Sequence, residues 1–176
     1  MVVEEKANSQ PQFAQFARMK LLIIDDEPEN VSILHDLLVD SGYSRVKTLT
    51  DSSQALETCR TFEPDLILLD LFMPQPDGLA VLTALRADRG DVFLPIVVLT
   101  GDTSEEMKRR VLSAGATDFL VKPFDFFEVL LRIGNLLETR RLHLKLDLQR
   151  AAYEDAVRER TAELRELEAQ LQVAAR

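Results

Sequence analysis

The chain has 176 residues, of which 46% are hydrophobic, and a formal net charge of −9 at pH 7. This length suffices for one domain core with residues to spare, and the acidic balance predicts no general attraction to nucleic acid or to anionic lipid. The single cysteine, Cys59, excludes an internal disulfide. No apolar run approaches the roughly 20 residues that span a bilayer and no secretory signal opens the chain, so we expect a cytoplasmic protein without membrane contact.

The first 17 residues are polar and aperiodic apart from Phe13 and Phe16, a pattern that indicates a flexible N-terminal tail at 1–17. After them, short apolar runs alternate with amphipathic segments. Three of the runs are apolar throughout, as is typical of strands that helices cover on both faces of a parallel sheet. The runs predict strands at residues 21–24, 45–49, 65–69, 95–99 and 118–122.

Helical periodicity and helix-end residues fill the intervals between these runs. Pro28 stands where a first helical turn would begin, Asp51 can cap the second helix and Gly115 ends the fourth. Thr103 and Ser104 are both candidates for the N-terminal cap of that fourth helix. Five strand–helix repeats predict an α/β fold, a doubly wound five-stranded parallel sheet, in which ligands bind beyond the carboxyl ends of the strands.

The C-terminal residues 135–176 contain neither glycine nor proline. We expect them to carry the last helix beyond a domain at 18–140, as a coiled-coil segment at 141–176. The stretch LHLKLDL at 142–148 alternates with the two-residue period of a strand, but no turn residues flank it, and we interpret it as helix. The apolar seam of this helix is formed by Leu146, Tyr153, Val157, Leu164, Leu167 and Leu171, with Arg150 and Arg160 interrupting it.

Side chains suited to phosphate chemistry stand at the ends of four predicted strands. Asp25 and Asp26 follow the first strand, Asp70 the third and Thr100 the fourth, and Lys122 ends the fifth. Because these ends share one edge of the sheet, the side chains should converge. Carboxylates about 5 Å apart repel by roughly 3 kcal/mol per pair at an effective dielectric near 20, which a divalent cation would relieve. An all-oxygen site suits Mg²⁺ with a phosphoryl oxygen in its shell.

Four motifs in this order resemble the receiver domain of bacterial two-component response regulators. They are DDE at 25–27, DLFMPQPDG at 70–78, LTG at 99–101 and LVKPF at 120–124. The resemblance covers roughly residues 19–140 and implies a flavodoxin-like fold that takes a phosphoryl group from a phosphohistidine on a sensor histidine kinase. It implies no enzymatic activity beyond the domain's own phosphorylation and dephosphorylation.

The resemblance also assigns roles to the residues that match its motifs. It implies that Asp70 is the phosphoacceptor, that Lys122 pairs with the phosphoryl group and that Thr100 donates a hydrogen bond to it. Phe119, three residues before the lysine, takes the aromatic switch position, where it lacks the hydroxyl of a tyrosine. The implied magnesium ligands are Asp25 and Asp26, with Asp26 favoured as the direct one, an oxygen of Asp70 and the backbone carbonyl of Phe72.

Other interpretations remain open from the sequence. Taken alone, Asp25 and Asp26 could simply cap the helix that begins at Pro28. A phosphatase of the haloacid dehalogenase type also uses an aspartyl nucleophile, but its motif needs a second aspartate at the position that Phe72 occupies. A phosphate-independent dimeric scaffold that uses only the C-terminal helix is a third class.

The segment VRERTAELREL at 157–167 resembles linkers that join receivers to output domains. The resemblance points first to HD-GYP cyclic-dinucleotide phosphodiesterases and less specifically to GGDEF cyclases or histidine kinases. We therefore expect a downstream output domain in a longer protein. A long apolar-seamed helix without a covering domain is expected to pair in parallel with its copy, so a homodimer is predicted.

Overall fold

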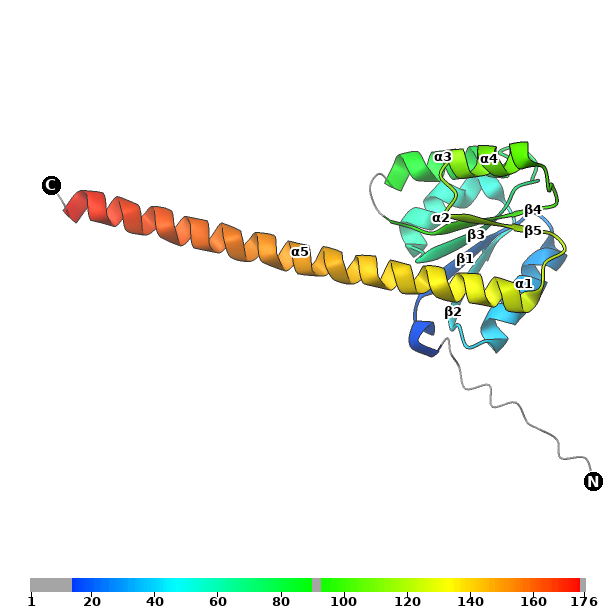
Figure 1. Ribbon diagram of the computed structural model, residues 1–176, viewed down its shortest axis with the longest axis horizontal. Helices are drawn as coiled ribbons and strands as arrows, with labels where there is room; N and C mark the ends of the chain where they lie inside the picture. Colours follow the sequence, from blue (N-terminus) through cyan, green and yellow to red (C-terminus); the bar gives the residue numbers. More distant parts are fainter. Residues whose placement is uncertain (1–13, 90–92, 175–176) are drawn as a thin grey trace, which may run out of the picture. The chain divides into compact units, whose positions relative to one another are not determined.

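The computed structural model describes residues 14–89 and 93–174. Its centre is a five-stranded parallel sheet with the strand order β2-β1-β3-β4-β5 (Figure 1). The predicted doubly wound, flavodoxin-like fold is therefore confirmed, with β3 and β4 each one residue later than predicted. The strands are β1 (Lys20–Ile24), β2 (Arg45–Leu49), β3 (Leu66–Asp70), β4 (Ile96–Thr100) and β5 (Asp118–Val121).

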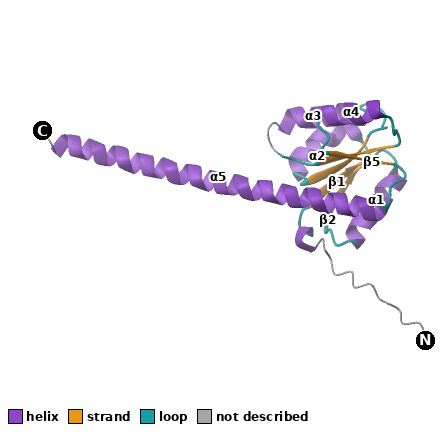
Figure 2. Ribbon diagram, in the orientation of Figure 1, coloured by secondary structure: helices purple, strands orange, loops and turns teal. Residues whose placement is uncertain are grey.

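Helices cover both faces of this sheet (Figure 2). On one face lie α2 (Ala55–Phe62), α3 (Gly78–Arg89) and α4 (Glu105–Ser113). On the other face lie α1 (Pro28–Asp40) and the first turns of α5 (Phe126–Ala174). None of the helices in the described part of the chain is both long enough and apolar enough to cross a membrane.

The helix caps follow the sequence signals closely. Asp51 accepts a hydrogen bond from the backbone N–H of Ser53 and so begins a short 3-10 turn, η2 (Ser52–Gln54), that leads into α2. Of the two candidates for α4, Ser104 is the cap, because its hydroxyl accepts the N–H of Met107 at 3.2 Å. A side chain placed in this way satisfies a backbone donor that the helix itself leaves unpaired.

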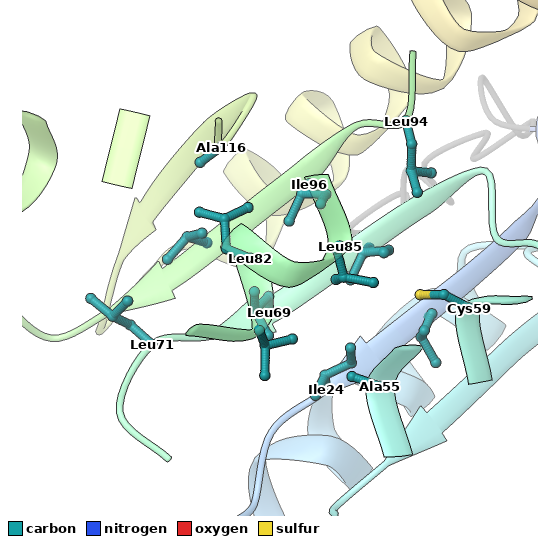
Figure 3. Packing of buried hydrophobic residues seen from close by; sticks show 14 of the residues in the cluster. Ile24, Ala55, Cys59, Leu69, Leu71, Leu82, Leu85, Leu94, Ile96 and Ala116 are labelled. Carbon is teal, nitrogen blue, oxygen red and sulfur yellow. The ribbon is translucent and has the colours of Figure 1, made fainter. Parts of the chain in front are cut away.

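Strand residues alternate between two hydrophobic clusters, one on each face of the sheet. Leu22 and Ile24 join the cluster beneath α2, α3 and α4, whereas Leu21 and Ile23 join the one beneath α1 and α5. Figure 3 shows the first cluster, in which Leu82 and Leu85 of α3 pack against Leu69 and Ile96 of the sheet. Each fully buried aliphatic side chain contributes about 1.5–3 kcal/mol, so both faces hold the strand ends rigidly.

The start of the described chain differs from the predicted flexible tail. Residues 1–13 of that prediction lie outside the described part, but Ala14–Phe16 form a 3-10 turn, η1. The ring of Phe16 is only 2% exposed and packs in the cluster beneath α1 and α5. Packing against the domain therefore begins before residue 18, because an aromatic ring buries a large apolar area.

The helix α5 runs without a break from Phe126 to Ala174, so the LHLKLDL stretch is helical as predicted. Val129, Ile133 and Leu137 are completely buried in the domain core. The chain divides into two compact units after Arg140. In the second unit, every side chain from 145 to 174 is exposed.

Candidate functional site

The strand-end residues are held in place by backbone hydrogen bonds that continue the sheet beyond its strands. Asp25 donates its N–H to the carbonyl of Leu49 at 3.2 Å, and Lys122 donates its N–H to that of Thr100 at 2.7 Å. Asp70 is itself the last residue of β3. Since β1, β3, β4 and β5 are parallel and in register, these residues share one edge of the sheet, as predicted.

Lys122 bridges the two buried carboxylates of this edge. Its Nζ lies 2.6 Å from Asp70 Oδ1 and 3.1 Å from Asp25 Oδ2. Asp25 is 1% exposed and Asp70 4%, so neither charge is well solvated. Charges removed from water require a partner of opposite sign or a cation, and one ammonium cannot neutralise two carboxylates.

Asp25 accepts hydrogen bonds from residues at the N-terminal end of α1. The backbone N–H of Glu27 donates to Asp25 Oδ1 at 2.9 Å, and the side-chain amide of Asn30 donates to Oδ2 at 3.2 Å. With Lys122, three groups therefore fix this carboxylate. Its position is set by the protein before any ligand arrives.

The carboxylate of Asp70 is pinned by two donors on opposite oxygens. Phe72 donates its backbone N–H to Oδ2 at 2.9 Å, while Lys122 occupies Oδ1. Burial raises the pKa of Asp70 above its ordinary value, and the nearby charge of Asp25 adds to this. The hydrogen bond and charge of Lys122 work in the opposite direction but do not overcome burial.

The ammonium of Lys122 is held in its charged form. Burial by itself would lower its pKa, but the hydrogen bond that the ammonium donates to Asp70, followed by the charges of Asp70 and Asp25, raises the pKa above its ordinary value. The lysine is thus a fixed positive charge at neutral pH. Such a group can stabilise added negative charge at the Asp70 carboxylate without any proton transfer.

The same edge offers oxygen ligands for a metal ion. Carboxylate oxygens of Asp25, Asp26 and Asp70 all lie within 4.8 Å of one another. Asp26 is only partly buried, so its carboxylate faces water more than that of Asp25 does. A compact, all-oxygen set with an open side fits a hard divalent cation such as Mg²⁺, which keeps several waters.

The remaining predicted residues lie around this centre with different contacts. Thr100 is 2% exposed, and its hydroxyl accepts the backbone N–H of Asp102 at 3.0 Å. Phe119 packs partly buried against the cluster beneath α4, with the Nζ of Lys108 5.6 Å from its ring centre. The Phe72 side chain is 58% exposed beside Asp70. The structure therefore brings the three aspartates and the lysine together, with Thr100 on the adjoining strand end.

Comparison with family profiles matches residues 21–134 to the response regulator receiver domain. The chain belongs to this family. The receiver is 40% identical over 121 residues to the transcriptional regulatory protein PrrA of Mycobacterium bovis, which covers 69% of this chain and 51% of that protein. It is 39% identical over 118 residues to the alkaline phosphatase synthesis transcriptional regulatory protein PhoP of Bacillus subtilis, covering 67% and 48%. The chain thus spans about half the length of these curated relatives.

Solved structures show the same similarity to the receiver fold. The chemotaxis protein CheY4 of Vibrio cholerae superposes with a TM-score of 0.63 at 33% identity, over 68% of this chain and 99% of that one. A putative response regulator from Chloroflexus aurantiacus gives a TM-score of 0.63 at 30% identity, over 69% and 98%. In both cases the match is to nearly the whole of the solved chain.

Two residues of the receiver site were not singled out from the sequence. Asn30 contacts the Asp25 carboxylate, and Gly78 lies so close to Asp70 that a Cβ built there would be 2.2 Å from its carbonyl oxygen. Both occur within the motifs that carried the resemblance or directly after them, at DDEPEN and DLFMPQPDG. Only the folded backbone shows why those residue types are needed.

Proposed function

We propose that this receiver accepts a phosphoryl group on Asp70 from a phosphohistidine of a sensor histidine kinase, in a Mg²⁺-dependent reaction. The observation that carries the proposal is the Lys122 ammonium shared between two buried carboxylates, next to a third acid. A cation would balance this excess of negative charge and would bind an oxygen of the incoming phosphoryl group. Phosphoryl transfer depends mainly on such positioning and charge neutralisation.

The bond changes in the proposed reaction are simple. An oxygen of Asp70 forms a bond to phosphorus while the bond from phosphorus to the imidazole nitrogen breaks, and the electron pair stays with the imidazole. An acyl phosphate on Asp70 and a free histidine result. Asp25, Asp26, Asp70 and the Phe72 carbonyl would hold Mg²⁺, with Asp26 favoured over Asp25 as the direct ligand, and the ion would supply positive charge to the phosphoryl oxygens.

The side chains of the receiver have separate roles in this proposal. Lys122 leaves the Asp70 oxygen and pairs with the new phosphoryl group. The Thr100 hydroxyl already accepts the N–H of Asp102, so its own proton remains available for a phosphoryl oxygen. Phe119 would then respond to the displacement of Thr100 as the switch aromatic, through packing alone because it has no hydroxyl.

The proposed output passes through α5 to a domain beyond this chain. We place the boundary between the receiver, at 18–140, and a coiled-coil dimerisation helix, at 141–176, at the point where buried residues of α5 give way to exposed ones. The linker resemblance favours an HD-GYP phosphodiesterase as output. PrrA and PhoP, the two curated relatives described above, are transcriptional regulatory proteins, so a DNA-binding output domain is the second candidate.

Mass measurement after treatment with acetyl phosphate tests the phosphoacceptor role. The wild-type chain should gain one phosphoryl group in the presence of Mg²⁺ and none in EDTA, because the three carboxylates otherwise repel the donor. Asp70→Asn should remain unlabelled. Labelling of that variant, or turnover of p-nitrophenyl phosphate as by a haloacid-dehalogenase-type phosphatase, would overturn the assignment. Failure to bind beryllofluoride would favour the phosphate-independent scaffold.

A further inference from the structure

Asn30 connects two carboxylates at the first turn of α1. Its amide nitrogen lies 3.2 Å from Asp25 Oδ2 and 2.8 Å from Glu27 Oε2. We propose that Asn30 is a positioning residue that holds the Asp25 carboxylate in place while Lys122 changes partner during phosphoryl transfer. This inference rests on the proposed function and adds a residue to its machinery.

The need for such a residue follows from the sharing of Lys122. In the structure, the ammonium serves both Asp25 and Asp70. Once Asp70 carries a phosphoryl group, the strongest acceptor near Lys122 is a phosphoryl oxygen, which draws the ammonium away from Asp25. Asp25 is 1% exposed, so water cannot readily replace the lost donor.

The donors that remain on Asp25 come from the start of α1. The backbone N–H of Glu27 holds Oδ1 at 2.9 Å, and the Asn30 amide holds Oδ2, the oxygen that Lys122 would leave. Asn30 is therefore the side chain that keeps this oxygen satisfied. A carboxylate that lost both donors on one oxygen would rotate and disturb the neighbouring metal ligands.

The chemistry of an amide suits this place better than a charged donor would. A lysine or arginine could satisfy Asp25 and Glu27 equally well, but its positive charge beside the Asp25 carboxylate would oppose the binding of Mg²⁺. An asparagine supplies two N–H donors and no net charge. It also separates the carboxylates of Asp25 and Glu27, which would otherwise repel each other.

The test compares Asn30→Ala with Ser32→Ala, a matched loss of a polar group from the exposed side of the same helix. Mg²⁺ affinity is measured by isothermal titration calorimetry, and labelling by acetyl phosphate is measured at saturating Mg²⁺. Asn30→Ala should weaken Mg²⁺ binding by about tenfold, because the loss of a contact to a metal ligand commonly has an effect of this size. It should also slow labelling at saturating Mg²⁺. Ser32→Ala should change neither. Asn30→Leu keeps the approximate volume of the side chain but lacks the amide. It should show the same loss of Mg²⁺ affinity, and it replaces Asn30→Ala if the alanine variant folds poorly.

A background with Asp25→Asn separates positioning from helix capping. If Asn30 acts through Asp25, then Asn30→Ala on that background should cause no further loss of Mg²⁺ affinity. An equal loss of Mg²⁺ affinity on the wild-type and Asp25→Asn backgrounds would overturn the inference. So would an Asn30→Ala variant with a lowered Tm but unchanged Mg²⁺ affinity and labelling. A wild-type chain that binds Mg²⁺ but is not labelled would overturn the phosphoacceptor function alone, and the calorimetry would still decide the role of Asn30.

Discussion

Asp70 is a carboxylate that the fold makes unusually easy to protonate. Its pKa is raised by burial, so the folded chain binds a proton here at pH values where the unfolded chain does not. Stability from this group is therefore greatest at low pH and falls as the pH rises through the raised pKa. Asp70→Asn removes this dependence together with the negative charge, and its single amide oxygen can still accept from either Lys122 or Phe72.

We predict that, in EDTA, Asp70→Asn is more stable than wild type at pH 7 and that the difference shrinks as the pH falls towards about 4. Urea unfolding of both chains at several pH values measures this difference in unfolding free energy. At pH 7 the buried charge of Asp70 destabilises the wild type, and protonation at lower pH removes that charge. The amide variant has no charge at this position at any pH. A difference that stays constant across this pH range would contradict the raised pKa.

Gly78 shows how closely the first residue of α3 packs against the end of β3 that carries the acceptor. A Cβ at this position would lie 2.2 Å from the carbonyl oxygen of Asp70 and 2.6 Å from Leu71 Cα. We predict that Gly78→Ala costs about 1–3 kcal/mol of unfolding free energy, because backbone must move to admit the methyl group, and that it reduces labelling by acetyl phosphate. Gly101→Ala is the matched control, since a Cβ there meets no atom within 4 Å. Equal stability of both variants would refute this contact.

At the scale of elements, the strands and the acidic site were predictable because both follow from short-range patterns. Buried parallel strands give continuous apolar runs, and their carboxyl ends meet on one edge, so Asp25, Asp70 and Lys122 could be grouped without coordinates. The packing of Phe16 could not be foreseen, because its ring is covered by residues far away in the sequence. The contact of Asn30 with Asp25 depends on side-chain directions, which spacing does not specify.

The long helix carries an anchor that periodicity also failed to indicate. Arg140 is charged yet only 9% exposed, and its Nη1 donates to the carbonyl of Phe93 at 2.6 Å. Its Nε lies 3.6 Å from a carboxylate oxygen of Asp65, whose other oxygen accepts the N–H of Lys20. The arginine thereby ties α5 to the segments that enter β1, β3 and β4.

We predict that Arg140→Met lowers the unfolding free energy of the receiver by about 2 kcal/mol, because a charged hydrogen bond is lost and its partly buried acceptors remain. Arg165→Met, on the exposed part of the same helix, should change it by less than about 0.5 kcal/mol. Urea denaturation of both variants gives the comparison. If the two substitutions cost the same, Arg140 is not an anchor.

At the scale of the whole molecule, the C-terminal helix follows a seven-residue repeat that one chain leaves exposed. Both arginines that interrupt the seam have carboxylate partners on their own helix: Arg150 with Glu154 at 2.9 Å and Arg160 with Glu163 at 2.7 Å. Such pairs reduce the charge that a partner helix would meet, while the arginine stems cover apolar surface. The repeat places His143, Arg150, Val157, Leu164 and Leu171 at one core position and Leu146, Tyr153, Arg160, Leu167 and Ala174 at the other.

We predict a parallel homodimer held mainly by this helix. Light scattering should give twice the 19.9 kDa mass of one chain for the intact protein, and a single mass for a chain ending at Arg141, which retains the Arg140 anchor. Leu164→Gln with Leu171→Gln should dissociate the dimer, because both leucines lie in the seam. Leu148→Gln with Val173→Gln removes two exposed apolar residues that lie outside both core positions, and these substitutions should leave the dimer intact. Three results would show that another surface joins the copies: dimers of the shortened chain, a dimer that survives Leu164→Gln with Leu171→Gln, or a dimer lost with Leu148→Gln and Val173→Gln.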